Sequence, residues 1–212
     1  MARLYVTTTI PYVNAAPHIG HAQEFVEADT FVRHARSKKA EVYFLSGSDE
    51  NAIKNVDAAE KAGIPVAEFV SKNSKTFEDL LSALHVSNDQ FIRTSEDRHK
   101  KAAQALWQAT NPDDIYKKAY EGLYCLGCEL FYGREELNDK GECHEHPGKP
   151  LEIVREENYF FRLSRYAEWL RDLISTDALR IIPEFRKNEV LAFIDRGLQD
   201  FSVSRPSSRS QG

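Results

Sequence analysis

Apolar runs and amphipathic stretches alternate along the first half of this 212-residue chain. Short runs of β-branched and aromatic residues predict strands, and apolar residues at helical spacing predict helices. The predicted strands are 3–9, 41–47 and 90–95, and the predicted helices are 19–37, 48–63, 66–86 and 95–111. Strands that alternate with helices through short links form parallel sheets covered by helices, so the pattern predicts an α/β fold.

Serine and glycine residues mark the expected ends of these helices. Ser48 and Ser95 each precede an amphipathic stretch, where a serine side chain can accept a hydrogen bond from the first turn. Gly63 follows such a stretch and suits the left-handed conformation that often ends a helix. We therefore expect Ser48 and Ser95 to be helix caps and Gly63 to be a helix end.

The pattern changes from about residue 115. Strand-like stretches at 115–132 and 151–164 flank a turn-rich segment, which indicates a small β module. Helical patterns follow at 165–175 and 184–197, then a short predicted strand at 200–205 and a polar tail that is expected to fray. The predicted parts are an α/β domain at 1–114, a β insertion at 115–162 and a helical continuation with the tail at 163–212.

Composition places the chain among folded soluble proteins. Its residues are 42% hydrophobic and 29% charged, and no apolar run approaches the roughly 18 residues of a membrane-spanning helix. The N-terminus lacks the pattern of a secretory leader, so we expect a cytoplasmic protein without a membrane partner. The net charge of −5 neither supports nor excludes a nucleic-acid partner, because a local basic surface is sufficient for binding.

All three cysteines lie within one short window of the chain. Cys125 and Cys128 are separated by two residues, as are Cys143 and His146, and each pair falls in a predicted turn. Three thiolates and one imidazole suit Zn²⁺, and four protein ligands leave no open position, so the spacing predicts a structural zinc site. Clustered cysteines in a reducing compartment also argue against a disulfide-linked partner.

Two alternatives to this ligand set stay open. His144 competes with His146 for the fourth position, although the two-residue gap favours His146 and leaves His144 for a supporting contact. The cysteines could instead be buried apolar residues beside an exposed histidine pair. Their concentration in a single window favours the metal.

The loop between the first strand and the first helix carries a candidate anion site. Pro11 and Pro17 bound the loop, and His18 and His21 flank Gly20 where the helix should begin. Backbone N–H groups at a helix start lack partners and attract anions, and both imidazoles can donate to phosphate oxygens. Taken alone, the histidines could equally be a loop residue and a polar position of the first turn.

The surrounding residues make this loop specific. The stretch "PYVNAAPHIGHA" resembles the His-Ile-Gly-His signature of class I aminoacyl-tRNA synthetases, and in particular the methionyl-tRNA synthetase family. Other stretches resemble the same family in the same order: "GSDENAIKNVDAAEKAG", "FIRTSEDRHKK", "EGLYCLGCE", "ENYFFRLSRY" and "RKNEVLAFIDRGLQDFSVSRP". The resemblance implies the N-terminal half of a Rossmann-like nucleotide-binding fold, with a single-zinc connective insertion.

The resemblance also implies which residues hold the nucleotide. By position, His18 and His21 would contact the triphosphate of ATP and act in catalysis, and Gly20 would admit the adenosine. Glu24 would contribute on the nucleotide side. Mg²⁺ would accompany ATP, as it does in nucleotidyl transfer generally.

The methionine site is implied by a second set of positions. Asp49 matches the aspartate that binds the substrate's α-ammonium, although it could also be a simple helix cap. Ile10, Pro11 and Tyr12 match the wall of the methionine pocket, with core packing as the alternative for Ile10. The implied reaction forms methionyl-adenylate from L-methionine and ATP, releases pyrophosphate, and transfers the methionyl group to the 3′ adenosine of tRNA(Met).

The chain departs from the family pattern in one respect. It contains no Lys-Met-Ser-Lys-Ser string, so it resembles an N-terminal fragment of such a synthetase. We expect this fragment to be inactive alone and its full-length parent to be active.

Two rival interpretations remain. One is a zinc-ribbon module that binds tRNA or protein without catalysis. The other is a different class I synthetase, such as a cysteine-type enzyme, whose zinc would keep an open position for the substrate.

Overall fold

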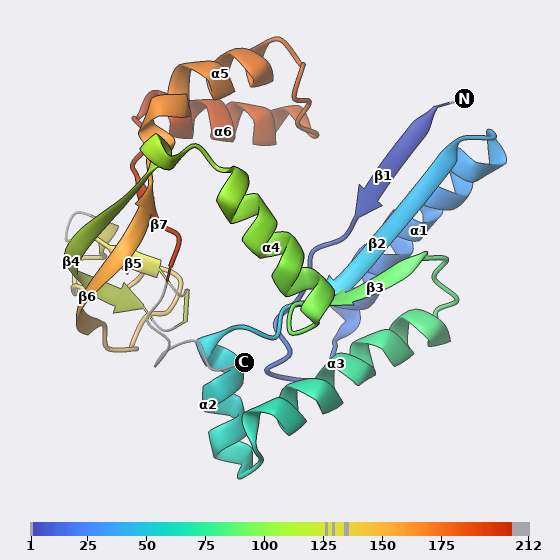
Figure 1. The fold of residues 1–212 in the computed structure, drawn as a ribbon, viewed down its shortest axis with the longest axis horizontal. Coiled ribbons are helices and arrows are strands. Elements are labelled where there is room, and N and C mark those ends of the chain that lie inside the picture. The colour runs from blue at the N-terminus through green and yellow to red at the C-terminus, as the bar shows by residue number, and fades with distance from the viewer. Residues whose placement is uncertain (1, 126, 129, 134–135, 205–212) are drawn as a thin grey trace. The chain divides into compact units, whose positions relative to one another are not determined.

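The structure, a computed structural model, describes residues 2–125, 127–128, 130–133 and 136–204 (Figure 1). The chain forms two compact units. The first is built mainly on the described residues up to Trp107. The second is built on Gln108–Cys125 and on the described residues of Leu130–Pro206.

The first unit contains a three-stranded parallel sheet. Its strands are β1 (Arg3–Thr7), β2 (Glu41–Ser48) and β3 (Gln90–Arg93), and they lie in the order β1-β2-β3. All the strands run parallel, so their carboxyl ends meet at one edge of the sheet. The predicted parallel α/β fold is confirmed.

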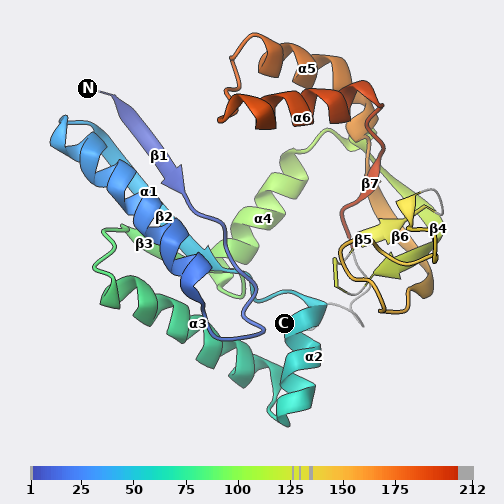
Figure 2. The same cartoon turned by 180° about the vertical axis from the view of Figure 1, so that it is seen from behind.

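Two helices cover one face of this sheet, as the views from the front and from behind show (Figures 1 and 2). They are α1 (Ile19–Ser37) and α3 (Val66–Ala83), whose apolar residues face each other and the sheet. The core between them contains Phe25 from α1 and Phe77 from α3, both fully buried. Val13 of the β1–α1 loop packs into the same cluster, which anchors the loop that carries the candidate anion site.

Two predicted helix starts are wrong. Ser48 does not cap a helix, because it is the last residue of β2 and its hydroxyl meets that of Ser74 at 2.7 Å. Helix α2 (Ile53–Ala62) begins later and ends at Gly63 in the left-handed conformation, as predicted. Helix α4 (Asp97–Ala109) likewise begins two residues after Ser95, which lies in the preceding turn. The strand ends therefore lead into short polar turns before each helix.

The second unit contains an antiparallel sheet and a pair of helices. Its strands are β4 (Ile115–Cys125), β5 (Leu130–Tyr132), β6 (Glu152–Phe161) and β7 (Phe201–Ser202), in the order β5-β4-β6-β7. The helical elements are η1 (Pro112–Asp114), η3 (Leu163–Tyr166), α5 (Ala167–Ser175) and α6 (Glu184–Asp195). Ile174 and Ile194 form the core between α5 and α6.

The late predicted strand at 200–205 becomes the short β7, which pairs with β6. The proposed division at residues 114 and 162 stays a prediction, and the expected fraying of the tail at 206–212 lies outside the described residues. In the described part of the chain, no helix combines the length and the apolar character that crossing a membrane requires.

Candidate active site and metal cluster

The start of α1 is capped by the two histidines of the predicted anion site. The Gly20 N–H donates to Nδ1 of His18 at 3.1 Å, and the His18 N–H donates to Nδ1 of His21 at 3.1 Å. The two rings stack with their centroids 3.9 Å apart. This reciprocal cap satisfies two backbone donors that would otherwise have no partner in the helix.

This cap changes the expected anion site. The backbone N–H groups of Gly20, His21 and Ala22 all donate to His18 within the cap, and their expected contact with an anion stays a prediction. Nδ1 accepts a hydrogen bond in both rings, so each neutral imidazole carries its proton on Nε2. The donors that the rings can offer to a phosphate are therefore the two Nε2–H groups.

Gly20 has a packing reason to lack a side chain. A β-carbon built at this position would lie 3.0 Å from Cε1 and 3.1 Å from Nδ1 of His18. That separation is shorter than an ordinary van der Waals contact, so any larger residue would displace the His18 ring. The glycine thus permits the cap, whether or not a nucleotide also approaches it.

His21 is held in its neutral form. Burial is the main cause that lowers its pKa below the usual value, and the nearby His18 lowers it further. The Glu24 carboxylate acts in the opposite direction. Phe77 contributes to this environment, because its ring meets that of His21 edge-on at 5.1 Å.

Glu24 organises the loop that precedes the helix. Its Oε1 accepts hydrogen bonds from the backbone N–H and the hydroxyl of Thr9, both at 2.7 Å. Asn73 of α3 donates to the Val13 carbonyl at 2.7 Å and fixes the middle of the loop. The structure thus gives Glu24 a definite contact within the chain, while its predicted role toward the nucleotide stays a prediction.

The residues predicted to bind methionine lie together at the carboxyl edge of the sheet. Tyr12 forms a parallel bridge with Asp49, and the Asp49 N–H donates to the Pro11 carbonyl at 2.9 Å. Ile10 lies over Gly47, since a β-carbon there would meet Cγ2 of Ile10 at 3.2 Å. The side chains of Ile10 and Tyr12 remain 39% and 37% exposed, which leaves both accessible to a ligand.

Asp49 is oriented by its neighbours. Its Oδ1 accepts the N–H of Asn51 at 2.9 Å and lies 3.5 Å from the hydroxyl of Thr94. Asn55 of α2, which is fully buried, donates to the Asp49 carbonyl at 3.2 Å. These contacts fix both the main chain and the carboxylate at this position.

Sequence reasoning missed the support behind Asp49. Glu50 is only 1% exposed, and its carboxylate accepts hydrogen bonds from Nε and Nη2 of Arg93 at 2.5 and 3.1 Å. The Glu50 N–H donates to Thr94 at 2.8 Å. The only signal in the sequence was an acidic residue directly after a buried strand, and a buried carboxylate requires a charged partner.

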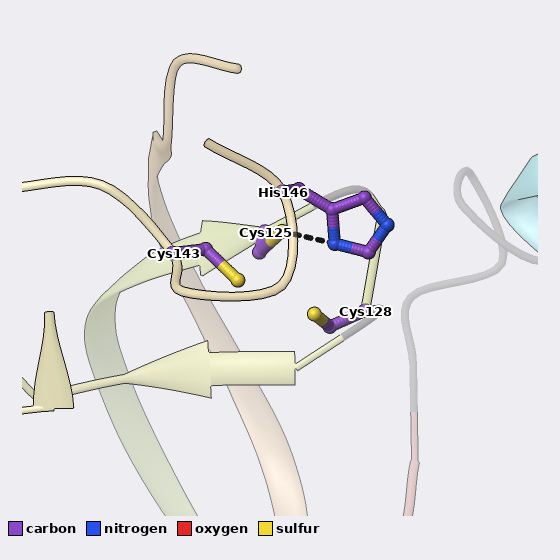
Figure 3. Close-up of side chains that lie close together, drawn as sticks. All are labelled: Cys125, Cys128, Cys143 and His146. Atoms are coloured by element: carbon purple, nitrogen blue, oxygen red, sulfur yellow. Dashed lines mark hydrogen bonds between the residues drawn. The ribbon is translucent and has the colours of Figure 1, made fainter. Parts of the chain in front are cut away.

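The four predicted metal ligands converge in the second part of the chain (Figure 3). The donor atoms of Cys125, Cys128, Cys143 and His146 all lie within 4.8 Å of one another. Cys125 and Cys143 are buried, and the Sγ of Cys125 lies 3.8 Å from Nδ1 of His146. His144 is exposed and is not part of the group.

The geometry suits a tetrahedral ion. With zinc–sulfur bonds of about 2.3 Å and zinc–nitrogen bonds of about 2.0–2.1 Å, a sulfur and a nitrogen donor of a tetrahedral site are separated by roughly 3.6 Å. The observed separation of 3.8 Å between Sγ of Cys125 and Nδ1 of His146 is close to this value. Four protein ligands would complete the shell, so the cluster can hold a metal ion without an open position.

Comparison with known proteins identifies the family. The sequence model described as tRNA synthetases class I (M) matches residues 4–209 of the chain. The chain belongs to this family.

Curated members of this synthetase family are similar to the chain over nearly all its length. The methionine–tRNA ligase of Brucella suis is 44% identical over 206 residues, which cover 96% of this chain and 40% of that protein. The methionine–tRNA ligase of Fusobacterium nucleatum is 40% identical, with 95% and 32% covered. The chain therefore spans less than half the length of these synthetases.

Solved synthetase structures agree with the fold. The methionyl-tRNA synthetase of Mycobacterium tuberculosis in complex with methionyl-adenylate superposes with a TM-score of 0.91 and is 40% identical, with 98% of this chain and 41% of that chain covered. Its apo form gives a TM-score of 0.74 at 36% identity. Within this synthetase family, the complete Cys₃His shell argues against the cysteine-type rival, which would need an open metal position.

Proposed function

We propose that the protein to which this chain belongs is a methionine–tRNA ligase. It activates L-methionine with ATP, releases pyrophosphate, and transfers the methionyl group from methionyl-adenylate to the 3′ adenosine of tRNA(Met). This chain supplies the first part of the catalytic domain and the metal-binding insertion. On its own it is inactive, because it spans only about 40% of a ligase such as that of Brucella suis.

One observation carries this proposal. The M. tuberculosis synthetase that binds methionyl-adenylate matches 98% of the chain with a TM-score of 0.91 and 40% identity. The ligand in that structure contains both the amino acid and the nucleotide of the proposed reaction.

Asp49 binds the α-ammonium group of methionine. Its carboxylate is held in place by Asn51 and Thr94, so the negative charge is oriented before the substrate arrives. The Tyr12 ring, bridged to the same strand end, offers a surface for the thioether, which interacts favourably with aromatic rings. Ile10 and Pro11 complete this wall of the pocket.

His18 and His21 bind the triphosphate of ATP through their Nε2–H groups. Their Nδ1 atoms are fixed by the helix cap, so the orientation of both rings is set by the backbone. The low pKa of His21 keeps it a neutral donor, which is directional and adds no permanent charge. Mg²⁺, bound with ATP, would neutralise part of the phosphate charge.

The Cys₃His cluster binds a structural Zn²⁺. Cys125, Cys128, Cys143 and His146 would hold the ion, and it would cross-link two turns of the insertion. Soft thiolate donors favour zinc over the hard cations that prefer oxygen.

Methionine-dependent exchange between ATP and labelled pyrophosphate tests the proposal. The protein to assay is a completed polypeptide, in which this chain is joined to the part of the M. tuberculosis synthetase that the match leaves uncovered. We expect exchange with methionine from the completed polypeptide and none from this chain alone. Exchange that depends on another amino acid, or full activity of this chain alone, would contradict the proposal.

A further inference from the structure

Asn55 is a buried polar residue in the first turn of α2, close to the strand end that carries Asp49. Its side chain is fully buried, and its Nδ2 donates to the Asp49 carbonyl at 3.2 Å. Its Oδ1 is also buried and has no hydrogen-bond partner among the residues that the structure describes. Within this part of the chain, the amide therefore gives its donor to Asp49 and leaves its acceptor unsatisfied.

The orientation of this amide is set by the group that it contacts. The Asp49 carbonyl can only accept a hydrogen bond, so the NH₂ group of Asn55 must face it. A rotated amide would bring two acceptors together and remove the bond to Asp49. The unsatisfied Oδ1 is therefore a consequence of the bond that holds the Asp49 main chain.

An apolar residue would suit the surroundings of Asn55 better. A buried acceptor without a partner lowers the stability of a protein, and native structures contain few such atoms. Ala59 lies one turn further along the same face of α2, and it is buried and apolar. A residue that conflicts with its local surroundings is most often found at a functional site. The conflict at Asn55 leads to the Asp49 main chain, which is the group that its amide contacts.

The bond from Asn55 fixes a link that has no regular structure of its own. Residues 50–52 connect β2 with α2 and form neither a helix nor a strand. The Asp49 N–H donates to the Pro11 carbonyl at 2.9 Å, and the Asp49 carbonyl accepts from Asn55. These two bonds hold the peptide groups on both sides of the Asp49 α-carbon. Because the direction of a side chain follows from the two backbone dihedral angles at its α-carbon, both bonds aim the Asp49 carboxylate.

We propose that Asn55 is a positioning residue for the substrate-binding carboxylate, and that its amide directs the Asp49 side chain at a cost in stability. The inference rests on the proposed ligase function, in which Asp49 binds the α-ammonium group of methionine. Asn55 is fully buried and acts through the Asp49 carbonyl. The ammonium group is bound throughout the activation step, so removal of the amide weakens the binding of methionine and of the transition state equally.

Apolar substitutions of Asn55 test the cost in stability. Asn55→Leu keeps the branched outline of the side chain, Asn55→Val is smaller, and both remove the amide. In urea unfolding of this chain, we expect at least one variant to have a midpoint equal to or higher than that of the wild type, because the unsatisfied acceptor is gone. A lower midpoint for both variants would show that the amide stabilises the fold and would overturn the inference.

The kinetics of methionine-dependent pyrophosphate exchange by the completed polypeptide test the positioning role. For the more stable of the two variants, we expect the KM for methionine to rise about fivefold, as for the loss of one hydrogen bond. Its kcat and its KM for ATP should stay unchanged, which is the pattern for a loss of uniform binding. An unchanged KM for methionine would overturn the inference.

Ala59→Gly is the matched control, because it weakens the same helix at a buried position one turn further from Asp49. We expect a lower urea midpoint, since glycine disfavours a helix interior, with an unchanged KM for methionine. An equal rise of this KM in Ala59→Gly and in the Asn55 variant would assign the effect to the helix as a whole and overturn the inference.

The positioning role and the ligase function fail in different ways. Methionine-dependent exchange by the wild-type completed polypeptide, together with an unchanged KM in the Asn55 variants, would refute the positioning role and leave the ligase function standing. Absence of exchange in the wild-type completed polypeptide would refute the ligase function and, with it, the positioning role.

Discussion

The Thr94 side chain joins the ends of two neighbouring strands, because its hydroxyl accepts the Glu50 N–H at 2.8 Å and lies 3.5 Å from Oδ1 of Asp49. Thr94 follows β3, whereas Asp49 and Glu50 follow β2. One hydroxyl thus links the residue that we assign to the substrate ammonium with the residue that pairs with Arg93. The same hydroxyl therefore adds to the contacts that hold Asp49 in place.

Substitution of Thr94 tests the link directly. Thr94→Val keeps the shape of the side chain but leaves the Glu50 N–H without its acceptor. We expect the free energy of unfolding to fall by about 1–3 kcal/mol, the cost of an unsatisfied buried donor. Thr94→Ser, which keeps the hydroxyl, should recover most of this loss in urea unfolding experiments. Equal stability of the valine variant and the wild type would show that the hydroxyl has no such role.

Replacement of His18 separates helix capping from ligand binding. Asparagine is among the best N-cap residues, so His18→Asn should retain the stability of the chain, whereas His18→Ala should lose about 1 kcal/mol. Both variants lack the Nε2–H group. In the completed polypeptide we expect both to reduce pyrophosphate exchange, the asparagine variant without loss of stability. Wild-type exchange by His18→Asn would assign the histidine to capping alone.

The pKa of His21 predicts how stability depends on pH. Burial lowers this pKa in the folded state, so below about 6.5 the unfolded chain binds a proton more readily than the folded chain does. The contribution of neutral His21 to the free energy of unfolding is therefore fully present above about pH 6.5. This contribution is lost as the pH falls from about 6.5 through the lower pKa that His21 has in the folded chain. Urea unfolding at several pH values should show a shallower decline for His21→Gln. A decline of the same steepness in His21→Gln and the wild type would contradict this prediction.

His144 and His146 lie two residues apart, but only His146 belongs to the metal cluster, so substitution of each in turn tests the ligand set. His146→Ala removes a donor, so it should weaken zinc binding and lower the free energy of unfolding of the zinc-loaded chain. His144→Ala should change neither quantity, because His144 is exposed and outside the cluster. Zinc titration against a competing chelator, with one ion expected per chain, measures the difference. Equal loss in both variants would contradict the ligand set.

The sequence predicted the elements of the first unit and the four clustered metal donors because these features are local. Hydrophobic periodicity specifies a helix such as α1, and a two-residue gap brings the donors of a pair together in a turn. Gly63 was also predicted correctly, since its left-handed conformation depends only on its immediate neighbours.

Contacts between distant residues were not predictable in this way. Ser48 was expected to cap a helix, but its partner Ser74 lies 26 residues away and draws it into the sheet. Glu50 and Arg93 are 43 residues apart, and no spacing rule relates them. The reciprocal cap of His18 and His21 was missed for a different reason, since a histidine is an unusual N-cap and propensity does not favour it.

Discrimination between methionine and its analogue without the amino group tests the central claim most directly. In the completed polypeptide, Asp49→Asn keeps the shape of the side chain and removes its charge, and Asp57→Asn removes the same charge from α2 as a control. We predict that the wild type and Asp57→Asn bind methionine far more tightly than 4-(methylthio)butanoate, and that Asp49→Asn loses most of this preference while ATP binding is unchanged. An Asp49→Asn variant that still prefers methionine as strongly as the wild type would contradict the account.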